Sequence, residues 1–307
     1  MPGKDKIRVG ILRGGSGEHY HTSLHKGGEI ISHILENLSH KYKPFDILVD
    51  KNGVWHLNGL PVDPSKLLYK VDMVWNLSQQ SFSNILESFS VKHIGVPAFS
   101  PFFELSREML RQRMAKVGIK MPRHIVIPLY QKDFDGPRER YAIKKAKEVF
   151  EKFSSPWIVK SYTPDSDQAI HLAKTFGELA GAIEDGVAHS RSILVEEFIP
   201  GKIATVHSVP MFRQEKIYTF PLGNSFGTFS PTEKEKLIEL VKKLHTHLGV
   251  RYYLKSDLLL GKRGRVYLLG FELTPDLRPD SHFREACQSV GAKPHQVVEH
   301  IIKKCLD

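Results

Sequence analysis

The sequence is poor in cysteine, since Cys287 and Cys305 are the only two among 307 residues. A disulfide framework needs several pairs of cysteines, and a cysteine-based zinc site needs about four ligands, so neither is expected. Both cysteines fall in stretches with a helical apolar pattern, which favours reduced thiols. Reduced thiols in turn favour a cytoplasmic location.

Long hydrophobic runs are also missing. No apolar stretch approaches the ~20 residues that a transmembrane helix needs. Residues 1–6 lead directly into a strand-like segment, without the apolar core of a signal peptide. We therefore expect no membrane association. Internal repeats and low-complexity tracts are absent as well, and the 41% of apolar and 25% of charged residues indicate an ordinary globular chain.

The formal net charge is +10, but the positive charge is not gathered into one segment. Lysines such as Lys144, Lys242 and Lys303 fall in helical stretches where acids are interleaved with them. The sequence contains no basic stripe with interleaved aromatic residues and no known nucleic-acid-binding motif. Nucleic acid is therefore not an expected partner.

The first third of the chain alternates between strand-like and helix-like segments. A glycine-rich turn follows the first strand, and a helix is expected at 22–38. This alternation predicts a parallel sheet covered on both faces. Prolines and aromatic residues at 97–103 indicate a boundary near residue 100. Strands are expected at 7–12, 45–49, 73–77 and 93–97.

Beyond residue 100, helices and shorter strands follow one another less regularly. A helix is expected at 106–117, with Met109, Leu110 and Val117 on its apolar face and Gly118 at its end. Residues 230–233 have the pattern of a capping box and open another helix. Pro294 opens a C-terminal helix whose apolar stripe is Val297, Val298, Ile301, Ile302 and Cys305. Strands are expected at 124–127, 157–160, 193–199, 204–210 and 216–221.

Two carboxylates near the C-terminus, Asp257 and Glu272, stand within two adjacent apolar runs, 252–260 and 266–275. The turn residues 261–264 lie between the runs, so the whole predicts a β-hairpin. Carboxylates buried in such a place need a cation or hydrogen-bond partners. If Asp257 pairs near Gly270, Lys255 lies near Glu272 on the same face of the hairpin.

This face of the hairpin has two interpretations. Two acids and one lysine suit a divalent ion that holds a phosphate, with Lys255 meeting further negative charge. The same residues could instead form a structural ion pair on an exposed face of the sheet. The hairpin alone leaves both interpretations open.

Several separated segments together identify a family. They are the strand and glycine turn at 9–16, the helix with Arg107, the strand that ends at Lys160, the segment 194–198, and the acidic hairpin. In this order and spacing they resemble the ATP-grasp superfamily, and within it the D-alanine–D-alanine ligases. The resemblance implies a mixed α/β and α+β fold in which a Rossmann-like N-terminal domain precedes a two-lobed ATP-grasp fold. The implied domains are 1–100, 101–188 (central lobe) and 189–307 (C-terminal lobe with the metal site).

The resemblance also implies a reaction. ATP phosphorylates the carboxylate of one substrate to an acylphosphate, and an amine then attacks it to give an amide, ADP and phosphate. The implied cofactors are ATP and Mg²⁺ (or Mn²⁺). The implied substrates are two D-alanines, or another amino acid, joined for cell-wall precursors, and the implied assembly is a homodimer.

Five residues correspond to the nucleotide site of that family. Arg107 and Lys160 match lysines that contact the phosphates. Glu196 matches the acid that accepts a hydrogen bond from the adenine amino group, and its neighbour Glu197 belongs to the same linker. Phe198 would pack on the adenine ring.

The catalytic and metal positions match less evenly. Lys255 stands where the family has an arginine that stabilises the transferred charge, and lysine keeps the charge without the bidentate fork. Asp257 matches a metal-binding aspartate. Glu272 either replaces the asparagine of a Glu-x-Asn motif, with Gly270 in place of the glutamate, or is itself that glutamate, with Thr274 in the asparagine position.

On the substrate side, Ser166 matches a serine in the loop after Lys160 and is expected to take part in catalysis. Glu18, or its neighbour His19, matches the acid that receives the amino group of the first substrate. Ser281 matches a serine that contacts the carboxylate of the second substrate.

Three departures from the family pattern concern activity. The loop after Lys160 contains Pro164 and two aspartates where glycine and serine would supply N–H donors to phosphate. The stretch 220–229 is short and lacks the lysine and tyrosine of the family's covering loop. Ile203 replaces a ribose-binding acid. These changes leave open slow catalysis, another substrate pair, or an inactive nucleotide-binding homologue.

Overall fold

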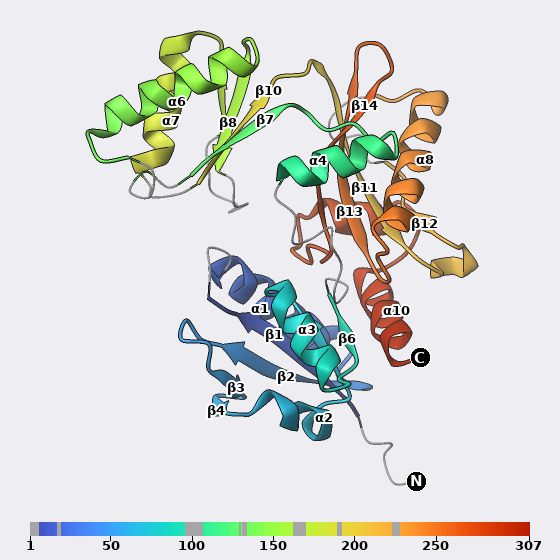
Figure 1. Cartoon of the computed structure of the whole chain (residues 1–307). Helices are drawn as coiled ribbons and strands as arrows, with labels where there is room; N and C mark the ends of the chain where they lie inside the picture. Colours follow the sequence, from blue (N-terminus) through green and yellow to red (C-terminus); the bar gives the residue numbers. More distant parts are fainter. Residues whose placement is uncertain are drawn as a thin grey trace, which may run out of the picture. The chain divides into compact units, whose positions relative to one another are not determined.

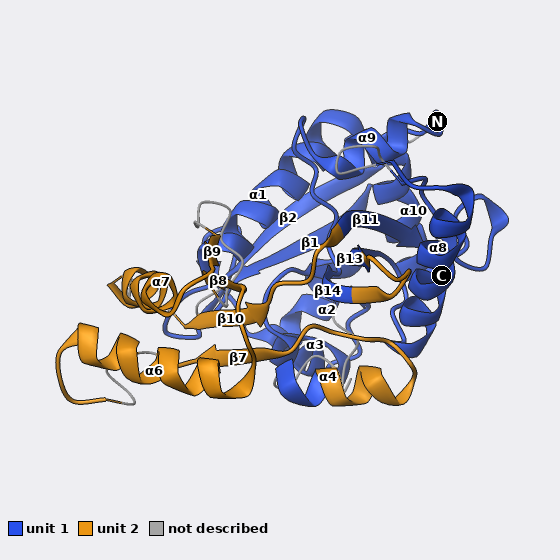
Figure 2. Cartoon of the chain, turned by 90° about the horizontal axis from the view of Figure 1, so that it is seen from above, with its two compact units in different colours: residues 1–110, 202–260, 268–307 blue, residues 111–201, 261–267 orange. Residues whose placement is uncertain are grey.

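The structure is a computed structural model, and it describes residues 6–16, 20–95, 107–128, 130, 134–161, 170–188, 192–222 and 228–307. Figure 1 shows the chain and the labels used below. The chain divides into two compact units, which Figure 2 distinguishes by colour. The first unit comprises residues 1–110, 202–260 and 268–307, and the second comprises 111–201 and 261–267.

The N-terminal part of the first unit is a six-stranded sheet of order β4-β3-β2-β1-β5-β6. β1 pairs in parallel with β2 and β5, and β5 pairs in parallel with β6, as the alternation of strands and helices predicted. The elements are β1 (Ile7–Gly14), α1 (Tyr20–Asn37), β2 (Tyr42–Val49), β3 (Trp55–Leu57), β4 (Leu60–Pro61), a 3-10 turn (Pro64–Lys66), α2 (Leu67–Lys70), β5 (Met73–Asn76), α3 (Gln80–Ser88) and β6 (His93–Ile94).

The glycine turn after β1 is confirmed. Gly14 and Gly15 have φ angles of +87° and +103°, in the left-handed region that side chains disfavour. A Cβ atom on Gly14 would lie 2.2 Å from the carbonyl oxygen of Val49, so no other residue fits there without movement of the backbone. The turn therefore has a steric requirement for glycine.

The C-terminal part of the first unit is a four-stranded sheet of order β12-β11-β13-β14. The predicted capping box is present at Ser230 and Glu233, with Pro231 in the first turn of α8. The predicted stripe of α10 is buried, and it shares one hydrophobic core with Val9 and Ile11 of β1. The elements are β11 (Gly201–Val209), a 3-10 turn (Phe212–Gln214), β12 (Tyr218–Thr219), α8 (Pro231–His247), β13 (Leu254–Gly261), β14 (Val266–Glu272), α9 (His282–Gln288) and α10 (Pro294–Leu306).

The second unit is a four-stranded antiparallel sheet of order β7-β10-β8-β9. The helices α6 and α7 lie side by side on this sheet (Figure 1), and the core between them contains Tyr141, Val149 and Trp157. The elements are α4 (Arg107–Lys116, which starts in the first unit), β7 (His124–Ile127), α6 (Arg138–Lys152), β8 (Trp157–Ser161), β9 (His171–Ala173), α7 (Phe176–Ala188) and β10 (Ile193–Glu197).

The mixed α/β and α+β class is confirmed, and two local predictions need correction. The apolar face expected on α4 is wrong in part, because Met109 is 49% exposed and the buried residue is Met114. The sequence pattern also missed the antiparallel hairpin of β3 and β4, whose strands are only two or three residues long. The division into domains at 1–100, 101–188 and 189–307 stays a prediction.

Candidate functional site

The acidic hairpin of β13 and β14 brings Lys255, Asp257 and Glu272 together in the first unit. The turn between the strands is closed by a hydrogen bond from the N–H of Gly261 to the carbonyl oxygen of Arg265, at 2.8 Å. The ammonium of Lys255 lies 2.9 Å from Oε1 of Glu272 and 3.4 Å from Oδ2 of Asp257. The prediction that Lys255 lies near Glu272 is therefore confirmed.

Two further side chains complete this group, and the sequence pattern indicated neither. Lys26, on α1, places its ammonium 2.6 Å from Oε2 of Glu272. Thr205, on β11, donates its hydroxyl proton to Oδ1 of Asp257, at 2.7 Å. Lys26 is 246 residues from Glu272, and only the tertiary fold brings them together. We call these five residues the acid–lysine group.

The charges of the acid–lysine group balance. Burial acts to raise the pKa of Glu272, but the positive charges and hydrogen bonds of Lys26 and Lys255 outweigh burial and lower it to about 2. Burial acts to lower the pKa of Lys255, and the charges of Glu272 and Asp257 outweigh that effect and raise it. Glu272 and Lys255 are therefore ionised at neutral pH, which suits the recognition of a charged ligand.

In the acid–lysine group, a divalent cation would compete with two lysines for the carboxylate oxygens. Mg²⁺ usually takes one or two carboxylates and fills its other positions with water and substrate phosphates, so Asp257 and Glu272 are suitable donors. In the structure, however, each oxygen of Glu272 already faces an ammonium. Within the described part of the chain, no cluster of three or more His, Cys, Asp or Glu residues could hold a metal ion. A cation that binds Glu272 must therefore share an oxygen with an ammonium or displace Lys26 or Lys255.

The residues expected to bind the nucleotide base lie in the second unit. Lys160, on β8, places its ammonium 2.6 Å from Oε2 of Glu196 on β10, whose side chain is only 4% exposed. Glu197 accepts hydrogen bonds from the backbone N–H and the guanidinium of Arg123. Phe198 is 39% exposed, so it is not a core residue and can stack on a planar ligand. Because Lys160 and the acid–lysine group belong to different units, their convergence on one ligand stays a prediction.

The remaining predicted residues are placed as follows. Arg107 begins α4 and donates from its guanidinium to the carbonyl oxygen of Leu269 on β14, at 3.0 Å. Ser281 caps α9, and its role toward a substrate stays a prediction. Glu18, His19 and Ser166 lie outside the described residues.

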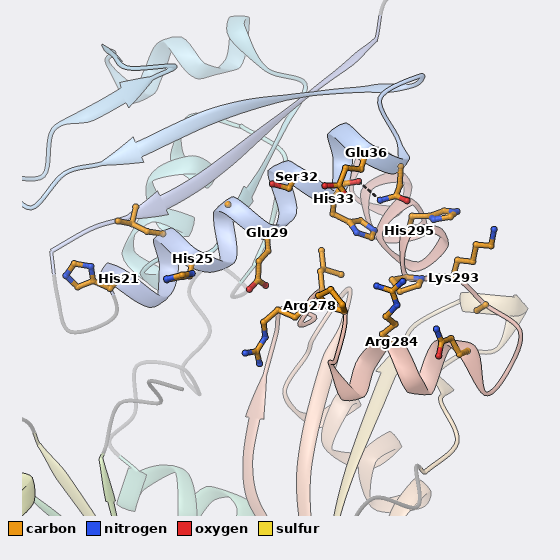
Figure 3. Close-up of a pocket in the computed structure, with 18 residues that line it drawn as sticks. His21, His25, Glu29, Ser32, His33, Glu36, Arg278, Arg284, Lys293 and His295 are labelled. Carbon is orange, nitrogen blue, oxygen red and sulfur yellow. Dashed lines mark hydrogen bonds between the residues drawn. The ribbon is translucent and has the colours of Figure 1, made fainter. Parts of the chain in front are cut away.

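A cavity of about 1070 Å³ lies in the first unit between α1 and the segment 277–295 (Figure 3). Its wall carries both signs of charge, from His25, Glu29 and His33 on α1 and from Arg278 and Arg284 opposite. Burial and the charge of the nearby Asp276 raise the pKa of Glu29. None of the residues assigned to the nucleotide or the metal lines this cavity.

In comparisons with known proteins, the chain is similar to D-alanine–D-alanine ligases. No family model matches the sequence. The D-alanine–D-alanine ligase of Treponema denticola is 20% identical over 364 aligned residues, which cover 98% of this chain and 96% of that protein.

Solved structures agree over the same length. The D-alanyl-alanine synthetase A of Vibrio cholerae superimposes with a TM-score of 0.70 at 15% identity, over 98% of each chain. The D-alanine–D-alanine ligase of Bacillus anthracis, solved in complex with ATP, superimposes with a TM-score of 0.64 at 15% identity and covers 99% of this chain and 98% of that one. The chain thus has the fold of the D-alanine–D-alanine ligases, and its sequence is similar to theirs over nearly its whole length.

Proposed function

We propose that the chain is an ATP-dependent carboxylate–amine ligase that makes D-alanyl-D-alanine or a similar dipeptide. The observation that carries this proposal is the ammonium of Lys255, held between Glu272 at 2.9 Å and Asp257 at 3.4 Å. A cation held in place before the reaction stabilises the charge of a phosphoryl group in transfer. The full-length similarity to D-alanine–D-alanine ligases supports the same reaction.

In the proposed reaction, a carboxylate oxygen of the first amino acid attacks the terminal phosphorus of ATP. The bond from that phosphorus to the bridging oxygen breaks, which releases ADP and leaves an acylphosphate. The free amine of the second amino acid then attacks the acyl carbon, the bond to the phosphate oxygen breaks, and the nitrogen loses a proton. The protein contributes by positioning and by fixed charge.

The second unit would hold the nucleotide base. In this assignment the buried carboxylate of Glu196 accepts a hydrogen bond from the adenine amino group, Phe198 stacks on the adenine ring, and Glu197 keeps the strand end in place through Arg123. Lys160 and Arg107 would contact the phosphates. Lys160 must turn away from Glu196, its present partner at 2.6 Å, to reach a phosphate.

Asp257 and Glu272 are the residues that would hold Mg²⁺ or Mn²⁺. A divalent cation supplies charge neutralisation to the phosphates when it is bound. Lys255 would remain beside the transferred group, and Lys26 would release Glu272. Glu18 or His19 would receive the amino group of the first substrate, and Ser166 would act in the loop after β8. We further propose a cytoplasmic location and a homodimer, as the resemblance implies.

The test is phosphate release from ATP with D-alanine and Mg²⁺. We expect release that depends on D-alanine, and a loss of roughly 100-fold or more in Asp257→Asn, because the variant lacks a carboxylate at the proposed cation site. The matched control is Asp72→Asn, which breaks an ion pair with Arg8 on the N-terminal sheet and should retain activity. Unchanged turnover in Asp257→Asn would remove Asp257 from the site.

One observation favours a second candidate, a ligase for another substrate pair. The hydroxyl proton of Ser281 is donated to the carbonyl oxygen of Asp276, at 2.8 Å, and is not available to a substrate carboxylate. Phosphate release only with other amino acids or hydroxy acids would support this candidate. A rise in melting temperature with MgATP, but no release with any acceptor, would indicate an inactive nucleotide-binding homologue.

A further inference from the structure

A buried chain of three polar side chains runs through the first unit beside the acid–lysine group. The hydroxyl of Tyr253 lies 2.7 Å from Nδ1 of His207, and Nε2 of His207 lies 2.9 Å from Nδ1 of His282. Tyr253 is 1% exposed and His207 is 2% exposed. Phe283 packs edge-on against both of these rings, so the hydrogen bonds lie in apolar surroundings.

The positions of the protons follow from the hydrogen-bond requirements of this chain. The hydroxyl of Tyr253 has no second hydrogen-bond partner in the described part of the molecule, and a buried O–H without an acceptor is costly. Tyr253 therefore donates to Nδ1 of His207. His207 then carries its proton on Nε2 and donates it to Nδ1 of His282.

His282 must consequently carry its proton on Nε2. Its Nδ1 is occupied as an acceptor, so a second proton on that ring would face the proton of His207. The pKa of His282 is lowered, mainly by burial, and this favours the same neutral form. The neutral ring presents a fixed N–H donor at Nε2, and this atom has no hydrogen-bond partner among the described residues.

The neighbour of His282 lacks the donor that was expected of it. Ser281 accepts a hydrogen bond from the N–H of Arg284 and donates its only hydroxyl proton to the carbonyl oxygen of Asp276. A carboxylate accepts hydrogen bonds and cannot donate them, so it gains nothing from Ser281. The next residue in the sequence, His282, has a hydrogen-bond donor available, the N–H at Nε2.

We propose that His282 is a substrate-binding residue for the carboxylate of the second, attacking amino acid, and that Tyr253 and His207 are positioning residues that keep its proton on Nε2. This proposal rests on the proposed ligase activity. A neutral donor suits this task, because it binds the carboxylate without adding a further cation near the amine that must attack as a free base.

The first test reads the protons directly and does not depend on activity. In the free protein, long-range ¹⁵N–¹H NMR spectra should show His207 and His282 both as neutral rings with the proton on Nε2. In Tyr253→Phe, which removes only the hydroxyl, the tautomer of His207 should no longer be fixed. A proton on Nδ1 of His282 in the wild-type protein would overturn the proposal.

The second test separates this inference from the proposed function. Hydroxylamine attacks an acylphosphate but has no carboxylate, so its reaction does not need His282. Because D-alanine competes with it as the acceptor, hydroxamate formation from ATP and D-alanine in His282→Leu should be at least as high as in the wild type. Dipeptide formation by His282→Leu should need at least 10-fold more of the second amino acid. His282→Gln, whose amide N–H can replace Nε2–H, should restore most of this loss.

The outcomes are distinct. Absence of hydroxamate in the wild type would overturn the proposed ligase activity, whatever the tautomers are. Hydroxamate formation together with an unchanged KM for the second amino acid in His282→Leu would overturn the role of His282 alone. In Tyr253→Phe, a KM for the second amino acid raised several-fold, with kcat unchanged and hydroxamate formation not reduced, would support the positioning role, and an unchanged KM would contradict it.

Discussion

At the scale of single residues, Lys26 is the member of the acid–lysine group that most affects the binding of a metal cation to Glu272. With Lys255 alone, Glu272 would keep one oxygen for a cation, but Lys26 occupies that oxygen at 2.6 Å. The ammonium of Lys26 contacts the carboxylate that, in the proposed function, would bind a metal ion. Because the side chain of Lys26 is 32% exposed, its ammonium can move into solvent when a cation displaces it.

The variant Lys26→Met should therefore bind Mg²⁺ more readily in the presence of ATP. Since the variant frees Oε2 of Glu272, the Mg²⁺ concentration at half of the maximal rise in Tm should fall several-fold. The matched control is Lys41→Met, which removes another 2.6 Å ion pair of the same unit, with Glu299. A higher Mg²⁺ requirement in Lys26→Met would mean that Lys26 itself binds the phosphates.

The lowered pKa of Glu272 predicts that the free energy of unfolding depends on pH. Its pKa is about 2 in the folded chain and 4.5 in the unfolded chain, so the folded state is favoured above pH 4.5 and loses this advantage as the pH falls from 4.5 towards 2. After allowance for solvent screening, the advantage is about 1–2 kcal/mol.

Denaturant unfolding of Glu272→Gln should therefore show a smaller fall in the free energy of unfolding between pH 6 and pH 3 than the wild type shows. Glu239→Gln, at an exposed position of α8, serves as the control and should follow the wild type. Equal pH dependence in Glu272→Gln and in the wild type would show that the two lysines do not hold this carboxylate.

At the scale of elements, α1 contains two adjacent glycines, of which one is closely packed and the other faces open space. A Cβ atom on Gly27 would lie 2.6 Å from Cδ and 3.0 Å from Cβ of Arg13, whose guanidinium is fixed by Asp46 at 2.7 and 2.8 Å. A Cβ atom on Gly28 would meet nothing within 4 Å. Gly27 thus allows α1 to approach β1 closely, and Gly28 does not have this role.

The pair gives a test in which the same substitution acts in opposite directions. Gly28→Ala should stabilise the protein by about 0.5–1 kcal/mol, since alanine favours the helix. Gly27→Ala should destabilise it by about 1–3 kcal/mol, since Arg13 or α1 must shift. Thermal unfolding of both variants provides the measurement, and a more stable Gly27→Ala would contradict the close approach of α1 to β1.

The hairpin of β13 and β14 illustrates what the sequence could predict. Its turn residues, its alternation and the approach of Lys255 to Glu272 follow from local spacing along two neighbouring strands. Lys26, Thr205 and His207 come from elsewhere in the chain, and no local pattern connects them with the hairpin. The capping box of α8 and the apolar stripe of α10 were likewise predicted, because they depend on residues three or four positions apart.

The apolar face of α4 was misjudged for a related reason. A periodic pattern identifies an apolar side of a helix, but the neighbouring elements decide which side is covered. Met109 is 49% exposed, and Met114 on the same helix is fully buried. The strands β3 and β4 were missed because segments of two or three residues have too few positions to show alternation.

At the scale of the whole molecule, the proposed function requires residues from both compact units to bind one triphosphate. Glu196, Phe198 and Lys160 come from the second unit, and Lys255, Asp257 and Glu272 come from the first. A nucleotide that binds both units should stabilise them together. MgATP at 100 times its dissociation constant would contribute about 2.7 kcal/mol, enough to raise the Tm by several degrees.

We propose that both units bind the same MgATP. The most direct test of this proposal is calorimetric titration of MgATP into the wild type, Lys160→Met and Asp257→Asn. We predict that each substitution weakens binding at least 10-fold, although the two residues belong to different units. Wild-type affinity in either folded variant would contradict a shared triphosphate site.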